Sequence, residues 1–139
     1  MPQVVHVVRC HYESTGFPAE VSFNADLLTR YLQGLILSPQ GALLVAVLDG
    51  VVIGAHGLQL ETPFFAPDLT AHEVFLFVQP GYRGLRVGAA LIEYAEQWAI
   101  SAGAKSIIIG NHPLSPPHVK DAYLRRGYRE AQTEYIKRL

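Results

Sequence analysis

The segment from Phe75 to Trp98 constrains the fold most, because its pattern changes abruptly from strand to loop to helix. Its first residues are apolar, as in a buried strand. Pro80 and Gly81 then form a turn. A short basic loop that contains glycines follows and opens directly into an amphipathic helix. The chain therefore passes from a strand, through a glycine-containing loop, to a helix N-terminus.

This loop has the physical properties of a binding site for a phosphate or diphosphate group. The first amides of a helix lack intrahelical acceptors, and the helix dipole places partial positive charge there. Gly84 and Gly88 allow ligand atoms to approach the backbone closely, and Arg83 and Arg86 add full positive charges. The spacing of Gly81, Gly84 and Gly88 excludes the Gly-x-Gly-x-x-Gly dinucleotide fingerprint, and no Gly-Lys-Ser/Thr follows.

The rest of the chain predicts alternating strands and helices within a single domain, residues 1–139. Asp49-Gly50 between two β-rich runs indicates a hairpin with a two-residue turn, and Gly54 and Gly57 suggest a bulge or a close neighbour in its second strand. The other predicted elements are a first strand at Val4–Arg9, a helix from about Asn24 to Leu35, a loop at Glu61–Ala71, a strand at His72–Val78, a helix from about Gly84 to Ala102, a buried inner strand at Lys105–Ile109, a short helix from Ser115 to Gly127, and one or two strands at Tyr128–Leu139.

Composition excludes several function classes. The net charge of −1 gives no general basic field, which argues against nucleic acid as a partner. No apolar run approaches the roughly 20 residues that cross a bilayer. Cys10 is the only cysteine, so no intramolecular disulfide can form. Since no signal peptide is evident either, we expect a cytoplasmic protein without a membrane partner.

The glycine loop resembles the acetyl-coenzyme A (acetyl-CoA) loop of the GCN5-related N-acetyltransferases, the GNAT family. The family signature is Gln/Arg-x-x-Gly-x-Gly/Ala, and this chain reads Arg83-Gly84-Leu85-Arg86-Val87-Gly88, followed by Ala89, so Arg86 occupies the position of the first signature glycine. The run Ala122–Tyr128 resembles the family's C-terminal Tyr-x-x-x-Gly-Phe. The order of elements matches over nearly the whole length. The resemblance implies the α/β (α+β) acyl-CoA N-acyltransferase fold, with a mixed, mainly antiparallel sheet of six to seven strands flanked by three to four helices.

The resemblance also implies acetyl-CoA as co-substrate and suggests which residues bind it. The main chain of Phe77 and Val78 is expected to pair with the pantetheine arm, and amides near Val78 to hold the oxygen that becomes charged during transfer. Asn111 could hydrogen-bond the pantetheine amide or the acceptor, although an Asn before His-Pro is also ordinary turn chemistry. The residues expected to bind the cofactor are Phe77, Val78, Arg83, Gly84, Leu85, Arg86, Val87, Gly88, Ala89 and Asn111.

Two residues are candidates for proton transfer. Tyr123 stands four residues before Gly127, where family members often protonate the departing thiolate; a phenol with a pKa of about 10 suits that task, and packing on the sheet is the alternative role. Glu73 stands where some members place a base. Simple alternation puts Glu73, Phe75 and Phe77 on one face, where apolar neighbours would raise the pKa of the carboxyl. The alternatives are a solvated carboxylate at the strand end and an ordered water as the base.

The histidines do not indicate a metal site, because none is in a His-x-x-x-His pair or beside a Cys-x-x-Cys. His112 and His118 flank a proline-rich turn beside the expected acceptor mouth, where one could act as a base or be an ordinary surface residue. Phe64 and Phe65 could line the acceptor cleft, cover a hydrophobic surface or contact a second copy.

The resulting hypothesis is an N-acetyltransferase that moves an acetyl group from acetyl-CoA to a primary amine of a small molecule or protein, by direct attack. One alternative is a CoA-binding sensor or assembly module, since Arg86 replaces the signature glycine. Another is the same fold without a cofactor. The compact size and the ending Glu134-Tyr135-Ile136-Lys137 look most like members found in phage and prophage genomes. A homodimer is compatible with the resemblance.

Overall fold

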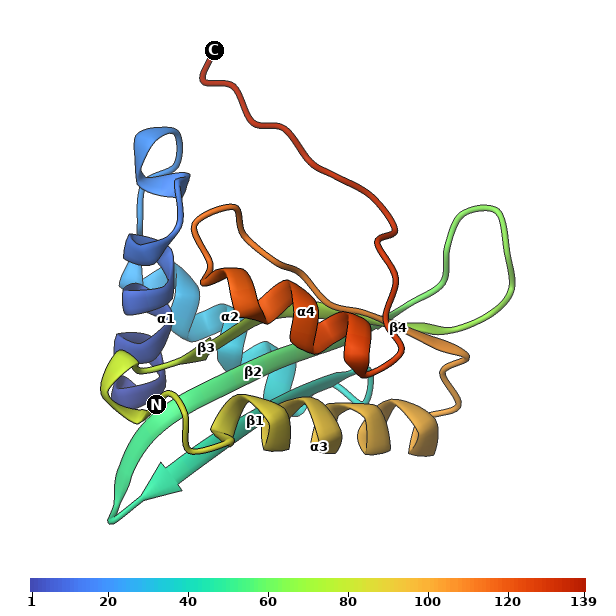
Figure 1. Ribbon diagram of the computed structural model, residues 1–139, viewed down its shortest axis with the longest axis horizontal. Helices are drawn as coiled ribbons and strands as arrows, with labels where there is room; N and C mark the ends of the chain where they lie inside the picture. The colour runs from blue at the N-terminus through green and yellow to red at the C-terminus, as the bar shows by residue number, and fades with distance from the viewer.

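The computed structural model describes residues 1–139 and consists of one four-stranded sheet with helices packed against it (Figure 1). The strand order is β1-β2-β3-β4; β1 and β2 pair antiparallel, as do β2 and β3, while β3 and β4 are parallel. The elements are α1 (Pro2–Ser14), η1 (Phe17–Ala19), α2 (Ala25–Leu37), β1 (Gly41–Leu48), β2 (Val51–Glu61), β3 (Thr70–Val78), η2 (Pro80–Tyr82), α3 (Val87–Ser101), β4 (Ser106–Ile108) and α4 (Pro117–Arg125).

The predicted hairpin is confirmed. Leu48 pairs with Val51 across the turn, and Asp49 and Gly50 have φ angles of 50° and 78°. Positive φ at both central residues is what a type I′ turn requires, and the Asp-Gly dipeptide tolerates it. The hairpin sets the register between β1 and β2, and β3 pairs with the other edge of β2.

A β-bulge in β3 reverses the predicted orientation of Glu73. Phe75 pairs with Gly57 and Glu73 pairs with Leu58, so Val74 has no partner on β2. Directly opposite residues share a face of the sheet, which places Glu73 with Leu58 and, two residues earlier on β2, with His56. Phe75 lies on the other face. The prediction that Glu73 shares a face with Phe75 and Phe77 is therefore wrong, because the bulge interrupts the alternation.

Different helices cover the two faces of the sheet. On one face, α1 and α2 pack against the sheet in a core cluster formed by Val4, Val7, Val8, Leu32, Ala55, Phe75 and Phe77. On the other face, α3 contributes its buried residues Leu91, Ile92, Ala95 and Ala99. The predicted buried stripe of this helix is largely confirmed, since Leu91 and Ala95 are buried and Val87, Trp98 and Ala102 are half-buried.

The N-terminal segment is a helix, which corrects the strand predicted at Val4–Arg9. Its β-branched residues Val4, Val7 and Val8 are spaced so that one helical face is buried against the sheet. Pro2 occupies the first turn, where its missing N–H is not needed. Burial of an apolar stripe thus outweighs the β propensity of valine.

The C-terminal end of the sheet is smaller than predicted. The sheet has four strands instead of six to seven. Residues 128–139 form no strand, and the tail leads away from the sheet (Figure 1). The segment is mostly polar, so pairing would bury little apolar area. Without a neighbour on that side, β4 is an edge strand, and its Ser106 and Ile108 are exposed. A strand is present within the predicted range Lys105–Ile109, but the prediction that it is a buried inner strand is wrong.

Candidate functional site

The loop between β3 and α3 presents a row of unpaired main-chain amides. The N–H of Arg83 donates to the carbonyl of Pro80 at 3.4 Å, and the N–H of Ala90 makes the first bond of the α3 ladder, to the carbonyl of Arg86 at 3.0 Å. Between them, the amides of residues 84–89 have no backbone acceptor. Free amides at a helix N-terminus fit a diphosphate, so the loop suits the phosphates of a coenzyme A thioester.

Backbone angles explain the glycine pattern of the loop. Gly84 has a φ of 88°, and Arg86 has a φ of 61°, making it one of two non-glycine residues with positive φ. Arg86 forms the N-cap of α3 in the left-handed region without a side-chain capping bond. A glycine would adopt that conformation at less cost, which is the physical reason for glycine at this position of the signature. The α3 helix begins at Val87, three residues later than predicted.

Arg83 lies against β3 rather than over the amides. Its Nε donates to the carbonyl of Val78 at 3.1 Å, and its guanidinium lies 5.1 Å from the centroid of the Phe77 ring. The side chain is exposed. Its Nε already has an acceptor, whereas the amides of residues 84–89 have none, so the main-chain amides are the preformed part of the site.

The strands β3 and β4 separate soon after they begin to pair. Only Thr70, Ala71 and His72 pair with β4, opposite Ser106, Ile107 and Ile108. Beyond His72, the edge of β3 that faces β4 has no strand partner, and this open edge includes the predicted pantetheine-binding residues Phe77 and Val78. We call this separation the fork. An extended ligand can pair with the open edge, as a strand would.

Glu73 lies at the base of the fork and its carboxylate bridges separate segments. Oε1 accepts a hydrogen bond from the N–H of Gly110 at 3.0 Å, and Oε2 lies 2.9 Å from Nε2 of His56. The Glu73 side chain is 8% exposed and that of His56 is 0% exposed. The carboxylate is thus neither at a solvated strand end nor in an apolar patch; it is buried among polar partners.

Tyr123 of α4 approaches the same carboxylate. Burial, followed by the nearby charge of Glu73, raises the pKa of the Tyr123 phenol well above its usual value of 10. Burial and the neighbouring Glu96 raise the pKa of Tyr128 to about 12. Arg126 fixes α4 to α3 through Glu93 at 3.4 Å and Glu96 at 3.2 Å. At neutral pH the Tyr123 phenol therefore keeps its proton and can act only as a proton donor.

On the α1 side, imidazole and aromatic rings pack together near the fork. The ring of His11 lies 5.1 Å from that of His112 and 5.6 Å from that of Phe77, and Phe17 contacts His112 edge-on at 5.5 Å. Burial and the charge of His112 lower the pKa of His11 to about 4, although Glu73 opposes this shift. His11 is therefore neutral at physiological pH. We call His11, Phe17 and His112 the mouth.

His112 was singled out from the sequence, whereas no role was given to His11 or His56. His56 had a detectable signal, since it is a lone histidine inside the apolar run Val51–Leu60. Asn111 follows Gly110 and is exposed, with no hydrogen bond from its side chain, and His118 is exposed on α4. Phe64 and Phe65 contact each other edge-to-face and are 98% and 78% exposed, so they do not line a cleft.

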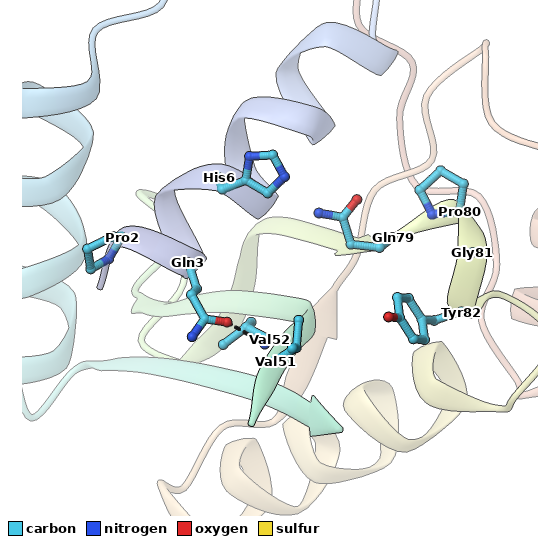
Figure 2. Close-up of a pocket in the computed structure, with 9 residues that line it drawn as sticks. All are labelled: Pro2, Gln3, His6, Val51, Val52, Gln79, Pro80, Gly81 and Tyr82. Carbon is cyan, nitrogen blue, oxygen red and sulfur yellow. Dashed lines mark hydrogen bonds between the residues drawn. The ribbon is translucent and has the colours of Figure 1, made fainter. Parts of the chain in front are cut away.

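A separate hollow of about 540 Å³ lies between the start of α1, the start of β2 and η2. In Figure 2, His6, Gln79 and Tyr82 border this hollow, and the Gln3 side chain accepts a hydrogen bond from the N–H of Val52 at 2.8 Å. None of the residues predicted to be catalytic or cofactor-binding lines it. Its connection to the site is through Pro80, Gly81 and Tyr82, which lead into the loop of free amides at residues 84–89. We call this loop the phosphate loop, because its free amides suit a phosphate group.

The family model of the acetyltransferase (GNAT) family matches residues 8–128. The chain belongs to the GNAT family. The curated aminoalkylphosphonate N-acetyltransferase of Salmonella typhimurium is 26% identical over 104 residues, which cover 75% of this chain and 67% of that protein. Membership confirms the predicted acetyl-CoA-dependent N-acetyltransferase, with an amine as acceptor and acetyl-CoA as co-substrate.

Solved structures confirm the fold of this GNAT chain. An aminoglycoside acetyltransferase, meta-AAC0020, from an uncultured soil metagenomic sample, in complex with sisomicin, superposes with a TM-score of 0.73 at 15% identity, over 99% of this chain and 86% of that one. Glucosamine-6-phosphate N-acetyltransferase from Arabidopsis thaliana gives 0.67 at 16% identity, over 84% and 79%. The aminoglycoside N-acetyltransferase AAC(6')-Iy in complex with CoA gives 0.68 at 17% identity, over 82% and 87%.

Two further features bear on possible partners. Each helix is too short or too polar to cross a bilayer. The structure also contains no group of three or more His, Cys, Asp or Glu residues placed to hold a metal ion.

Proposed function

We propose that Glu73 and Tyr123 are the base and the acid of acetyl transfer to a small primary amine at the fork. The observation that carries the proposal is their convergence: Glu73 on β3 and Tyr123 on α4 are close enough for the carboxylate charge to raise the phenol pKa. The open edge of β3 ends at the phosphate loop. A coenzyme A thioester held along that edge would therefore present its acyl group near both side chains.

The main chain would hold the co-substrate. The amides of residues 84–89 suit the diphosphate, and the open edge at Phe77 and Val78 suits the amide groups of the pantetheine arm. Acetyl-CoA supplies an activated acyl group as its thioester. The protein supplies orientation and electrostatic stabilisation.

The proton movements balance across the two residues. The nitrogen of the amine forms a bond to the acyl carbon as the carbon–sulfur bond breaks, the proton of the amine passes to Glu73 directly or through one water, and the Tyr123 phenol protonates the thiolate. Protonation of Glu73 removes the negative charge that helps raise the pKa of Tyr123. Tyr123 therefore becomes a stronger acid once Glu73 has accepted the proton of the amine.

The mouth favours a compact acceptor. His11 is neutral near pH 7, and it packs with His112 and aromatic rings, so this region adds little charge beyond that of Glu73. A small primary amine suits such a surface better than an extended polycation does. The named activity of the Salmonella typhimurium relative, on aminoalkylphosphonates, agrees with a compact amine.

The experiment measures thermal unfolding with acetyl-CoA and thiol release against an amine panel. The panel contains an aminoalkylphosphonate, glucosamine 6-phosphate, an aminoglycoside and a lysine peptide. Acetyl-CoA at 100 times its dissociation constant should stabilise the fold by about 2.7 kcal/mol, and a compact amine should release thiol. Stabilisation without thiol release would favour the sensor or assembly role, and no stabilisation would favour the fold without a cofactor.

The exposed edge of the sheet supports a homodimer. β1 has no strand neighbour on its outer side, contains no charged residue, and exposes Val45, Val47 and Leu48. Uncharged free edges favour pairing with another strand. Light scattering should give twice the mass of one chain, and Val45→Lys should reduce the dimer to a monomer.

A further inference from the structure

His56 is the only fully buried histidine, and it belongs neither to the phosphate loop nor to the proposed acid–base pair. It lies in the middle of β2 with an exposure of 0%. A buried polar side chain without partners is costly, so the contacts of the ring show what the position requires. Nε2 faces Oε2 of Glu73 at 2.9 Å, and Nδ1 lies 3.4 Å from the carbonyl oxygen of Leu91 on α3.

The contact with Glu73 is the shorter of the two. The Leu91 contact is at the limit of hydrogen-bond length, whereas the Glu73 contact has the length of a charge-assisted bond. The ring is not aligned for a hydrogen bond to Glu73 in this arrangement, and neither Nε2 nor Oε2 makes a hydrogen bond to any other group. Each atom is therefore the only group that can satisfy the other. We assign the imidazole proton to Nε2, because a carboxylate is the stronger acceptor.

The bulge at Val74 creates this pair. Because Val74 is unpaired, Glu73 turns to the face that carries His56. The second oxygen, Oε1, accepts from the N–H of Gly110 beyond β4. The carboxylate is thus held from β2 on one side and from the far arm of the fork on the other.

We propose that His56 is a positioning residue that fixes the Glu73 carboxylate at the fork and sets the pH range over which that carboxylate accepts a proton. The inference deepens the proposed function, since it rests on Glu73 as the base. A donor to a carboxylate favours its ionised form, and a buried carboxylate that loses the donor has a higher pKa. His56 therefore holds a possible donor directly against the carboxylate.

Other groups also face Glu73, and the test must separate them from His56. His11 faces it from α1, and the Tyr123 and Tyr128 phenols face it from α4 and the segment that follows. His11 is already neutral near pH 7, and both phenols keep their protons there. Of these side chains, only His56 is in direct contact with the Glu73 carboxylate. Replacing His56 therefore removes a possible donor to that carboxylate.

The experiment replaces His56 and follows Glu73 in two ways. His56→Phe fills a similar volume without a donor, and His56→Asn keeps a polar group that is too short to reach Glu73. His56→Gln retains an N–H near the carboxylate and should rescue. The two readouts are the pH profile of kcat/KM and the pKa of the Glu73 carboxyl, from ¹³C NMR titration of the protein without substrate.

The matched control is His72→Gln. His72 forms a similar histidine–glutamate pair, with Nδ1 3.0 Å from Oε2 of Glu61, but both side chains are exposed, at 43% and 52%. Its replacement should leave the profile and the Glu73 titration unchanged. In His56→Phe and His56→Asn, the pKa of the Glu73 carboxyl and the acid limb of the kcat/KM profile should both move up by about one pH unit. At pH values below the limb, kcat/KM should then be about tenfold lower than in the wild type, and at higher pH it should return to the wild-type value.

The outcomes separate this inference from the proposed function. An unchanged Glu73 titration and acid limb in a folded His56→Asn or His56→Phe protein would overturn the inference, even if the wild-type protein is active. A shifted titration in a protein that releases no thiol with any amine would support the His56–Glu73 linkage and overturn the proposed function. Rescue of the limb by His56→Gln would support a donor role rather than simple packing.

Discussion

The polar groups near the two ends of β3 differ in whether the protein itself supplies their partners. At the first end, the Glu73 carboxylate is buried: Oε1 accepts a hydrogen bond from Gly110, and Oε2 lies against the His56 ring, so both oxygens face segments distant in sequence. At the second end, the amides of residues 84–89 belong to one short segment, and none has a backbone acceptor. One end is closed by the protein itself, and the other offers free donors to a ligand.

The difference indicates that binding of the thioester and proton transfer depend on different parts of the site. Free amides bind whatever presents oxygen acceptors, so the phosphate loop should control affinity for the thioester. Buried and mutually oriented side chains control proton transfer, so the fork should control turnover. Changes at the fork should therefore lower kcat, and changes in the loop should raise the dissociation constant of acetyl-CoA.

The largest expected effect is at the fork, from Tyr123→Phe. Removal of the phenol leaves the departing thiolate without its proton donor, so kcat should fall by roughly 10²–10⁴-fold, and the dissociation constant of acetyl-CoA should change little. Stopped-flow thiol release and calorimetry measure the two quantities. Tyr94→Phe is the control, because Tyr94 is 64% exposed on α3. A normal kcat in Tyr123→Phe would remove Tyr123 from the mechanism.

In the loop, Gly84→Val should weaken binding of acetyl-CoA. The φ of 88° at this position is strained for a β-branched residue, at a cost of about 1–2 kcal/mol, so the loop should lose its binding conformation and the dissociation constant should rise about tenfold. The kcat at saturation should stay near the wild-type value. Gly81→Ala is the control, since its φ is not positive and no atom lies within 4 Å of the added Cβ. If kcat fell instead, loop and fork would not be separable.

The mouth should make stability depend on pH through His11. Its pKa is about 4 in the folded protein and 6.5 ordinarily, so between these values the unfolded chain binds a proton that the folded chain does not. Stability should therefore fall as the pH drops from about 6.5 to 4. Urea unfolding of His11→Gln should show a smaller decrease over this window. Equal slopes for the two proteins would show that His11 titrates normally.

The smallest effect is expected from Arg86→Gly, which restores the family signature. Release of the left-handed strain should stabilise the protein by about 1 kcal/mol or less, visible as a small rise in the melting temperature. Acetyl-CoA binding should be retained, because the amides are unchanged. Arg83→Gly is the control: its φ is −71°, so glycine there should only destabilise. A lower melting temperature for Arg86→Gly would show that the side chain stabilises the loop.

The sequence predicted the features that depend on neighbouring residues. The hairpin at Asp49-Gly50, the turn after β3, the phosphate loop and the apolar stripe of α3 are each encoded within a short segment. The fork was harder to predict, because His56, Glu73 and Gly110 meet only after the sheet has formed. Alternation failed at Glu73, since nothing local marks Val74 as a bulge. The valines of α1 suggested a strand because β propensity takes no account of the apolar area that these residues bury when the segment packs on the sheet as a helix.

The unpaired Val74 also has a consequence for how chains of this fold can diverge. Deleting Val74 would remove the bulge and leave Glu73 opposite Leu58, on the face that carries His56. If Val74 instead paired regularly with Leu58, Glu73 would pair with Gln59 and its carboxylate would turn toward the face covered by α1. Whether one aliphatic residue is paired or skipped thus decides on which side of the sheet the negative charge lies.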